Sequence, residues 1–193
     1  FKSAKIANSP AKNQLSHANF PAPFSSKMIS PQAIKVTQTL QQKGFSAYVV
    51  GGSIRDLLLE QKPKDFDVAT NAKPEEIRKI FPNCRLIGRR FRIAHILFRY
   101  EIVEVTTFRG MPDKTKNHPT HQIRSNEQGM LITDNQYGTI EEDAERRDFT
   151  VNSFYYDPST HTIIDFCSGV KDLKTRKLVM IGQPSIRLRE DPV

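Results

Sequence analysis

The segment KDFDVAT, residues 64–70, places two aspartates within a short apolar run. Because the side chains of a β-strand alternate between its two faces, Asp65 and Asp67 would share one face and Phe66 and Val68 the other. Like charges side by side on a strand repel each other unless a cation lies between them. The pattern therefore indicates either a site for a divalent cation or, more commonly for an isolated pair, a solvated strand edge or turn.

A glycine pair precedes these aspartates and follows FSAYVV (45–50), a β-branched and aromatic run that predicts a strand. Gly51 and Gly52 allow the backbone to approach an anion, and the helix predicted after them begins with unpaired N–H groups. Ser53 adds a hydroxyl, and Arg55 lies one turn into that helix. A glycine pair alone indicates only a tight turn. Here one strand–turn–helix–strand unit joins a phosphate-binding turn to a carboxylate pair, as a nucleoside triphosphate and its metal require.

The predicted strand EIVEVTTF (101–108) supplies a third carboxylate. Glu104 lies on the face opposite to the two valines that flank it, and a glutamate among β-branched residues is costly to bury unless it is paired. Glu101 falls in the predicted hairpin turn, where we expect it to be solvated. Asp65, Asp67 and Glu104 on neighbouring strands could hold two Mg²⁺ ions roughly 3.5–4 Å apart, the arrangement that catalyses phosphoryl transfer.

Two further polar clusters occur later in the chain. RRDFTVNSF contains Asp148 and Asn152, which would share one face of the helix predicted for residues 141–156. This cluster is either a mixed-charge helix surface or a group that binds a sugar hydroxyl and phosphates. RLRED, near the end, combines arginines with Glu190 and Asp191. Spacing alone assigns no role to this last group.

The order of the predicted elements indicates an α+β fold with a mixed sheet. A helix begins at Ser30-Pro31 and ends near Gly44. Strands and short helices then follow in an irregular order, with further strands expected at 161–166 and 177–182.

Composition divides the chain into three parts. Residues 1–29 are rich in Lys, Ser, Asn, Ala and Pro and predict a flexible basic extension. Residues 30–182 carry the periodic elements of one domain, with a long polar loop at 109–130, and residues 183–193 begin a further, truncated element. The chain starts without Met and stops within an element, which predicts that it is a fragment.

The formal net charge of +8 and the isoelectric point near 9.6 favour a polyanionic partner, although a basic surface can also serve solubility alone. Cys84 and Cys167 lack metal-ligand spacing, which is typical of free thiols in a cytoplasmic protein. No apolar run approaches the ~18 residues of a membrane-spanning helix. His95 is interpreted as a core histidine, and His118 and His121 lack a third ligand, so none is assigned to a metal.

Taken in order, VVGGSIRDLLL, KDFDVAT, EIVEVTTFRG, RRDFTVNS, DFCSGVKDL and REDPV resemble the motifs of the class II nucleotidyltransferases, the family of tRNA CCA-adding enzymes and bacterial poly(A) polymerases. The resemblance covers about residues 30–193. Within the family, LIGRRFRIAHILF (86–98) resembles the poly(A) polymerase branch. The resemblance implies a polymerase-β-like nucleotidyltransferase head with a mixed sheet and flanking helices, followed by a helical neck that starts at residues 183–193.

The resemblance also implies a role for each matching residue. The metal-binding catalytic pair would be Asp65 and Asp67, with Glu104 as the third carboxylate, and the triphosphate-binding turn would be Gly51, Gly52, Ser53 and Arg55. The ribose-recognising motif would contain Arg147, Asp148 and Asn152, and the base-selecting motif would begin with Glu190 and Asp191. Ser168 stands where the family usually has a first glycine, so we expect a stiffer hinge at Gly169. The base-selecting motif stops before its expected arginine, which predicts weak or no activity for the chain as given.

The implied activity is template-independent transfer of AMP from ATP to RNA 3′ ends, with two Mg²⁺ ions as cofactors. The nearest alternative is a CCA-adding enzyme, which also accepts CTP and requires a tRNA end. An RNA-binding module with a degenerate nucleotidyltransferase core is an alternative of another class, and the presence of all three carboxylates argues against it. A small-molecule nucleotidyltransferase fits the aspartate pair but not the basic charge. The implied partners are RNA 3′ ends and ATP in the cytoplasm, and no motif identifies accessory RNA-decay proteins.

Overall fold

A computed structural model describes residues 18–88, 91–110, 124–125, 131–133 and 137–182. Most of its strands form one eight-stranded sheet, against which the helices pack. Across the sheet lie, in order, β1 (Ala18–Pro21), β10 (Thr162–Asp165), β9 (Phe154–Asp157), β2 (Ala47–Val50), β3 (Asp67–Thr70), β6 (Ile102–Thr107), β5 (Ile93–Leu97) and β4 (Cys84–Ile87). This architecture confirms the predicted α+β class with a mixed sheet.

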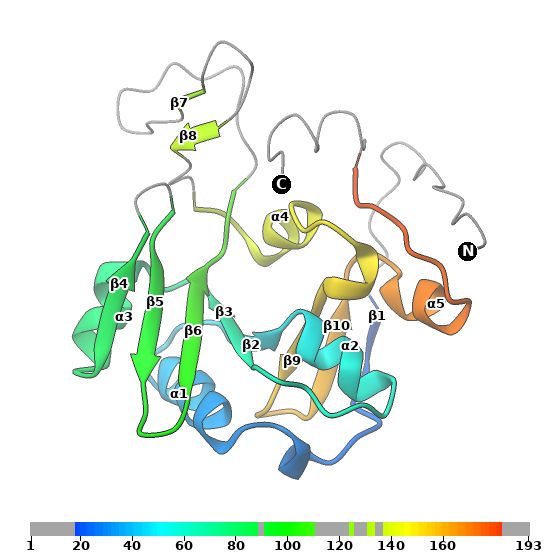
Figure 1. The fold of residues 1–193 in the computed structure, drawn as a ribbon, viewed down its shortest axis with the longest axis horizontal. Coiled ribbons are helices and arrows are strands. Elements are labelled where there is room, and N and C mark those ends of the chain that lie inside the picture. The colour runs from blue at the N-terminus through cyan, green and yellow to red at the C-terminus, as the bar shows by residue number, and fades with distance from the viewer. Residues whose placement is uncertain (1–17, 89–90, 111–123, 126–130, 134–136, 183–193) are drawn as a thin grey trace.

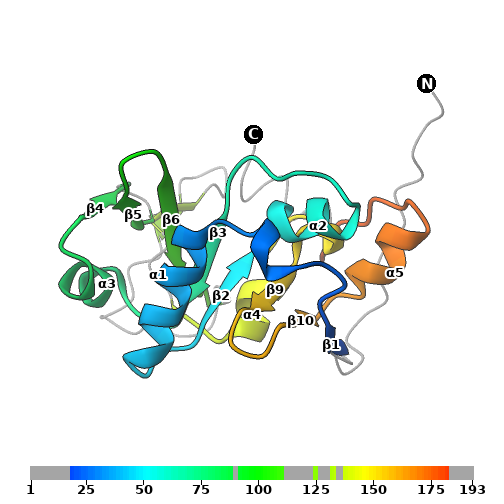
Figure 2. The same ribbon diagram turned by 90° about the horizontal axis from the view of Figure 1, so that it is seen from below.

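Strand β3 lies near the centre of the sheet, between β2 and β6 (Figure 1). It pairs antiparallel with β2 and parallel with β6, and the other described neighbours in this sheet are antiparallel. In the parallel register Val68 lies opposite Val105. Parallel strands need a crossover rather than a hairpin, and here α3 (Pro74–Ile80), β4 and β5 provide it. Figure 2, seen from below, shows the same progression from β4 to β1 across the molecule.

Helices on both faces of the sheet enclose two hydrophobic clusters. The larger cluster joins α1 (Pro31–Gln42), α2 (Gly52–Leu58) and α3 to one face, and the smaller joins α4 (Ile140–Glu145) to the other. The predicted start of α1 is confirmed, since the Ser30 hydroxyl accepts hydrogen bonds from the N–H groups of Gln32 and Ala33 at 3.2 Å each. Within the described residues, no helix is both long and apolar enough to cross a membrane.

The expectation of a flexible extension through residue 29 is wrong for its second half. Strand β1 pairs antiparallel with β10 at one edge of the sheet, and a 3-10 helix, η1 (Ser26–Met28), follows it. Ala22 and Phe24 between them are buried in the larger cluster. The local composition hides this segment because its partner strand lies far later in the chain. Residues 1–17 lie outside the described part of the structure.

The helix predicted for residues 141–156 is also wrong beyond its first turns. Helix α4 stops at Glu145, and a 3-10 turn, η2 (Thr150–Asn152), leads into β9. The reason is the aromatic run of β9, which is almost fully buried between β2 and β10 and therefore forms a strand rather than continuing a helix.

Two other expectations need correction. The stretch 177–182, predicted as a strand, makes only one isolated bridge, from Met180 to Phe149. The stretch 109–130, predicted as a loop, contains β7 (Arg124–Ser125), which pairs with β8 (Leu131–Thr133) in a separate two-stranded sheet. In both places the polar and apolar patterns are short, so pairing with residues outside the predicted stretch decides the structure.

We predict that Phe24→Ala destabilises the protein, although Phe24 lies in the predicted extension. The residue is 8% exposed, and its ring centroid lies 5.5 Å from that of Tyr156. Removing a buried aromatic side chain should lower the free energy of unfolding by about 3 kcal/mol. Urea unfolding followed by circular dichroism measures the change. Met28→Ala, at a position that is 47% exposed, is the matched control, and equal losses in the two variants would contradict the packing of this segment.

Candidate functional site

The glycine pair forms the turn from β2 to α2. Gly51 has φ 80° and ψ −145°, a backbone conformation that residues other than glycine rarely adopt. Its N–H group donates a hydrogen bond to the Phe154 carbonyl at 3.2 Å. A Cβ atom at Gly51 would lie 3.5 Å from Arg147 Nη1, and one at Gly52 would lie 3.3 Å from Arg55 Nη2. Two guanidinium groups therefore lie directly against this turn.

Arg55 connects the turn to η2. Its Nη1 donates to Asn152 Oδ1 at 2.6 Å, and its Nε and Nη2 donate to Asp56 Oδ1 at 2.9 and 2.7 Å. Asn152 Nδ2 in turn donates to Asp148 Oδ1 at 3.4 Å. The predicted proximity of Asp148 and Asn152 is therefore present, although a 3-10 turn rather than an α-helix brings them together.

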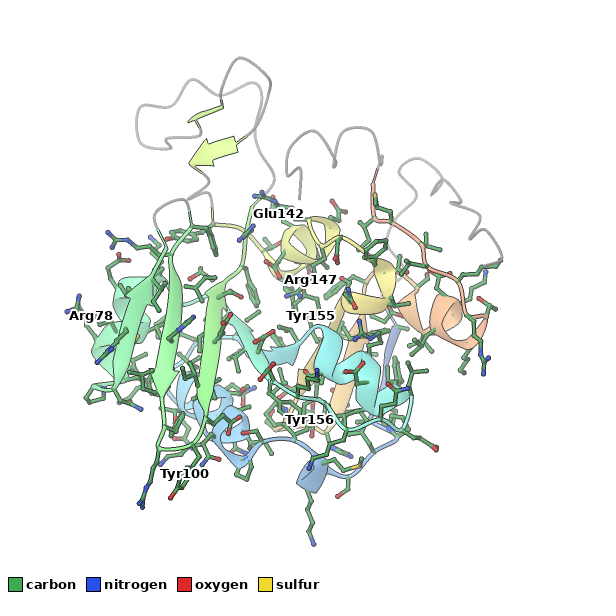
Figure 3. All side chains as sticks on the ribbon, in the orientation of Figure 1. Arg78, Tyr100, Glu142, Arg147, Tyr155 and Tyr156 are labelled. Carbon is green, nitrogen blue, oxygen red and sulfur yellow. The ribbon has the colours of Figure 1, made fainter. Side chains whose placement is uncertain are left out.

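Arg147 is held by a network that the sequence analysis missed. Its Nε donates to the Tyr155 hydroxyl at 3.0 Å and its Nη2 to Asp143 Oδ2 at 3.2 Å, while the Tyr155 hydroxyl donates to the same Asp143 oxygen at 2.7 Å. Figure 3 shows Arg147 and Tyr155 next to each other below α4. Burial raises the pKa of the Tyr155 hydroxyl, which therefore remains a donor at neutral pH. The four-residue spacing of Asp143 and Arg147 was the available sequence signal.

The two aspartates occupy the start of β3. The strand begins at Asp67, so Asp65 precedes it rather than lying within it as predicted. The predicted alternation nevertheless holds, because Asp65 and Asp67 are exposed while Phe66 and Val68 are buried. Continuing the parallel register of Val68 with Val105 by one residue places Asp67 beside Glu104 of β6.

The pKa of the Asp67 carboxyl group reflects the negative charge around it. Its pKa is raised to about 6, first by loss of hydration, then by Glu104, and further by Asp65, while Arg147 acts in the opposite direction. Glu104, Asp65 and Arg147 are therefore all close enough for their charges to act on Asp67.

The three carboxylates suit a metal ion by their chemistry more than by their spacing. In the described part of the chain, no three side chains of His, Cys, Asp or Glu are grouped closely enough to hold a metal ion. The donor set fits Mg²⁺, because that ion prefers carboxylate oxygens. A cation would also relieve the repulsion from Glu104 and Asp65 that, after loss of hydration, raises the pKa of Asp67. Asp65, Asp67 and Glu104 thus suit Mg²⁺ by charge and ligand type, although the three carboxylates are not gathered into a ready-made site.

Two residues of the β5–β6 hairpin differ from their sequence interpretation. His95, expected in the core, lies opposite Glu104 in the β5–β6 pair, with its Nε2 atom 3.3 Å from Glu104 Oε1. Glu101, expected to be solvated, is half-buried and accepts a hydrogen bond from the Ser30 hydroxyl at 2.7 Å. It therefore ties the β5–β6 hairpin to the start of α1.

The structure describes Ser53 but not the residues predicted to select the base. The buried Ser53 hydroxyl donates to the Val50 carbonyl at 3.1 Å, so contact with a phosphate stays a prediction. Glu190 and Asp191, predicted for base selection, lie outside the described residues, as do the two arginines at 89 and 90 in the branch-specific motif.

Ser168 is the N-cap residue of α5 (Gly169–Lys174). Its φ of 59° lies in the left-handed region, where glycine is favoured. The buried Asp165 carboxylate anchors this turn by accepting hydrogen bonds from the N–H groups of Cys167, Gly169 and Val170 at 3.1, 2.9 and 3.0 Å. A Cβ atom at Gly169 would collide with the Thr150 carbonyl, so α5 packs directly against η2. This packing fixes Thr150, the first residue of the turn that also contains Asn152. The predicted stiffness of the hinge stays a prediction.

A mixed sheet whose central parallel pair carries carboxylates beside a glycine turn, flanked by two arginines, has the architecture of a nucleotidyltransferase head. The sequence profile of the poly A polymerase head domain matches residues 47–179, and the chain belongs to this family.

Relatives and solved structures agree with this assignment. The chain is 54% identical over 183 residues to poly(A) polymerase I of Haemophilus influenzae, covering 94% of this chain and 40% of the relative. It is 38% identical over 163 residues to the CCA-adding enzyme of Lactobacillus helveticus, covering 83% and 37%. The crystal structure of the Bacillus stearothermophilus CCA-adding enzyme in complex with CTP superimposes with a TM-score of 0.66 at 32% identity, covering 85% of this chain and 37% of that one. The chain thus spans about two fifths of these relatives.

We predict that Asp67→Asn stabilises the protein when divalent metal is removed with EDTA. The folded-state pKa of about 6 exceeds the ordinary value of 3.8, so the folded state loses stability as pH rises from about 4 to about 6. The neutral amide should therefore raise the free energy of unfolding at pH 8 by up to about 1 kcal/mol, a figure reduced for screening of an exposed group, and should have no such effect at pH 4.

Urea unfolding at the two pH values measures this effect, with Glu60→Gln, at an exposed position of another segment, as the control. A loss of stability in Asp67→Asn at pH 8 would contradict the repulsion among the carboxylates.

Proposed function

We propose that this chain is the head of an enzyme that transfers AMP from ATP to RNA 3′ ends without a template. The proposal rests above all on the two registers of β3. The pairing with β6 places Asp67 beside Glu104, and the pairing with β2 places Asp67 opposite Val50, the residue before the glycine turn. The net charge of +8 suits a polyanionic RNA substrate. The free thiols of Cys84 and Cys167 suit the cytoplasm as the compartment.

In this proposal Asp65, Asp67 and Glu104 hold Mg²⁺, for which two ions are expected. When bound, these ions lower the pKa of the attacking hydroxyl and neutralise charge on the triphosphate. The carboxylates also fix the position of the reacting groups relative to the sheet. The RNA 3′-hydroxyl gives up its proton to solvent, and its oxygen attacks the α-phosphorus of ATP. The bond from that phosphorus to the oxygen bridging the α- and β-phosphates breaks, and pyrophosphate leaves with that oxygen.

The remaining predicted residues bind the nucleotide. Gly51 and Gly52 would let the triphosphate approach the backbone. The guanidinium groups of Arg55 and Arg147, which lie against this turn, would pair with its negative charge. Asp148 and Asn152 present an acceptor and an amide for the ribose hydroxyls, and Arg55 keeps Asn152 in place. Glu190 and Asp191 keep their predicted role at the base.

The preference for ATP and poly(A) synthesis over CCA addition rests on similarity. Relatives named poly(A) polymerase I are 54% identical to this chain, whereas those named CCA-adding enzyme are 38% identical or less among the curated relatives compared. CCA addition is the second candidate, supported by the fold shared with the CTP complex of the Bacillus stearothermophilus enzyme.

The test supplies the full-length protein with Mg²⁺, a short labelled RNA, and either ATP or CTP. We expect long products with ATP alone. Loss of the metal-binding carboxylates in Asp65→Ala/Asp67→Ala should lower the rate by about 10³-fold or more, because bound metal contributes several kcal/mol to transition-state stabilisation. The double variant Glu60→Gln/Glu141→Gln changes the charge equally at exposed positions and should keep its activity.

Other outcomes favour other functions. Addition that stops after a few nucleotides and requires CTP on a tRNA end would assign the protein to CCA synthesis. Retained RNA binding without transfer of either nucleotide would favour a degenerate binding module and contradict the proposal.

A further inference from the structure

We propose that His95 is a positioning residue that holds the Glu104 carboxylate in the orientation needed for metal binding; this inference rests on the proposed function. Both residues lie on one face of the sheet, as direct cross-strand partners in the β5–β6 pair. His95 Nε2 lies 3.3 Å from Glu104 Oε1. The histidine side chain is 20% exposed and the glutamate side chain 47%.

Glu104 occupies the middle of a row of polar side chains that crosses four strands. On its β5 side the row continues to His95 and then to Arg85 of β4, because those residues are cross-strand partners. On its β3 side the parallel register brings Asp67 beside it. Glu104 therefore has an imidazole on one flank and a carboxylate on the other.

The two flanks act on Glu104 in different ways. Repulsion between Glu104 and Asp67 is part of what raises the pKa of Asp67, and a free glutamate would relieve it by rotating about its three side-chain bonds. A contact to Oε1 at 3.3 Å restricts that rotation and leaves the second oxygen, Oε2, for a metal ion. Partners of this kind orient metal-binding carboxylates, and their loss typically costs 10–100-fold in metal affinity or activity.

The structure also explains why a histidine on β5 suits this role. Ala94 and Ile96, the neighbours of His95 in the strand, are fully buried, so the backbone that carries the imidazole is fixed. The imidazole has only two rotatable side-chain bonds, and it is mostly enclosed. By contrast Arg85, the next residue in the row, is exposed on β4. It therefore offers a matched control that changes charge on the same face without contacting Glu104.

The experiment compares His95→Leu, His95→Gln and Arg85→Gln in the full-length protein. Leucine removes the nitrogen that faces Glu104, whereas glutamine places an amide nitrogen near the position of Nε2. Mn²⁺ affinity is measured by electron paramagnetic resonance in the absence of nucleotide and RNA. The kcat and the KM for ATP are measured at saturating and at limiting Mg²⁺, and urea unfolding checks that each variant folds.

We expect His95→Leu to bind Mn²⁺ about 10-fold more weakly and to lose 10–100-fold in kcat at limiting Mg²⁺, with the KM for ATP nearly unchanged. In His95→Gln and Arg85→Gln, Mn²⁺ affinity and kcat should stay within about 3-fold of the wild-type values. Mn²⁺ affinity and kcat unchanged in His95→Leu would overturn the inference, as would an equal loss in His95→Gln. If the wild-type protein transfers no nucleotide, the proposed function fails. The Mn²⁺ measurement would still decide the role of His95.

Discussion

The parallel pairing of β3 with β6 is the contact on which the arrangement of the site depends. Asp67 is the first residue of β3 and Glu104 lies within β6, and the register of Val68 with Val105 makes the two carboxylates neighbours on one face. The crossover that a parallel pair requires contains β4 and β5, so the same topology places β5 on the other side of β6. One strand order therefore brings Asp67, Glu104 and His95 into a single row.

A second pairing, of β9 with β2, completes the site. Val50 at the end of β2 lies opposite Tyr155 of β9, and the next residue, Gly51, donates to the Phe154 carbonyl. The glycine turn and the segment that carries Arg147 are far apart in the sequence, and this pairing is what brings them into contact. Arg147 Nη1 thus lies against the turn, held there by Tyr155 rather than by the helix that the sequence suggests.

Local pattern predicted the elements that depend on neighbouring residues. Alternation placed the two aspartates opposite to Phe66 and Val68, and Glu104 opposite to the valines that flank it. The glycines of the turn and the cap of α1 were evident from residue type. Features that depend on distant pairing were missed, among them β1 and the early end of α4. Each of these is decided by a partner strand that local composition does not reveal.

The charge balance of the site links it to the core of the domain. Three carboxylates repel one another, and Arg147 is the cation that opposes them at Asp67. A guanidinium that is only 22% exposed needs acceptors of its own, and it finds them in Asp143 and Tyr155. Tyr155 is also a fully buried member of the smaller hydrophobic cluster. Packing of that cluster therefore fixes the position of Arg147, and through it the electrostatic environment of the carboxylates on the neighbouring strands.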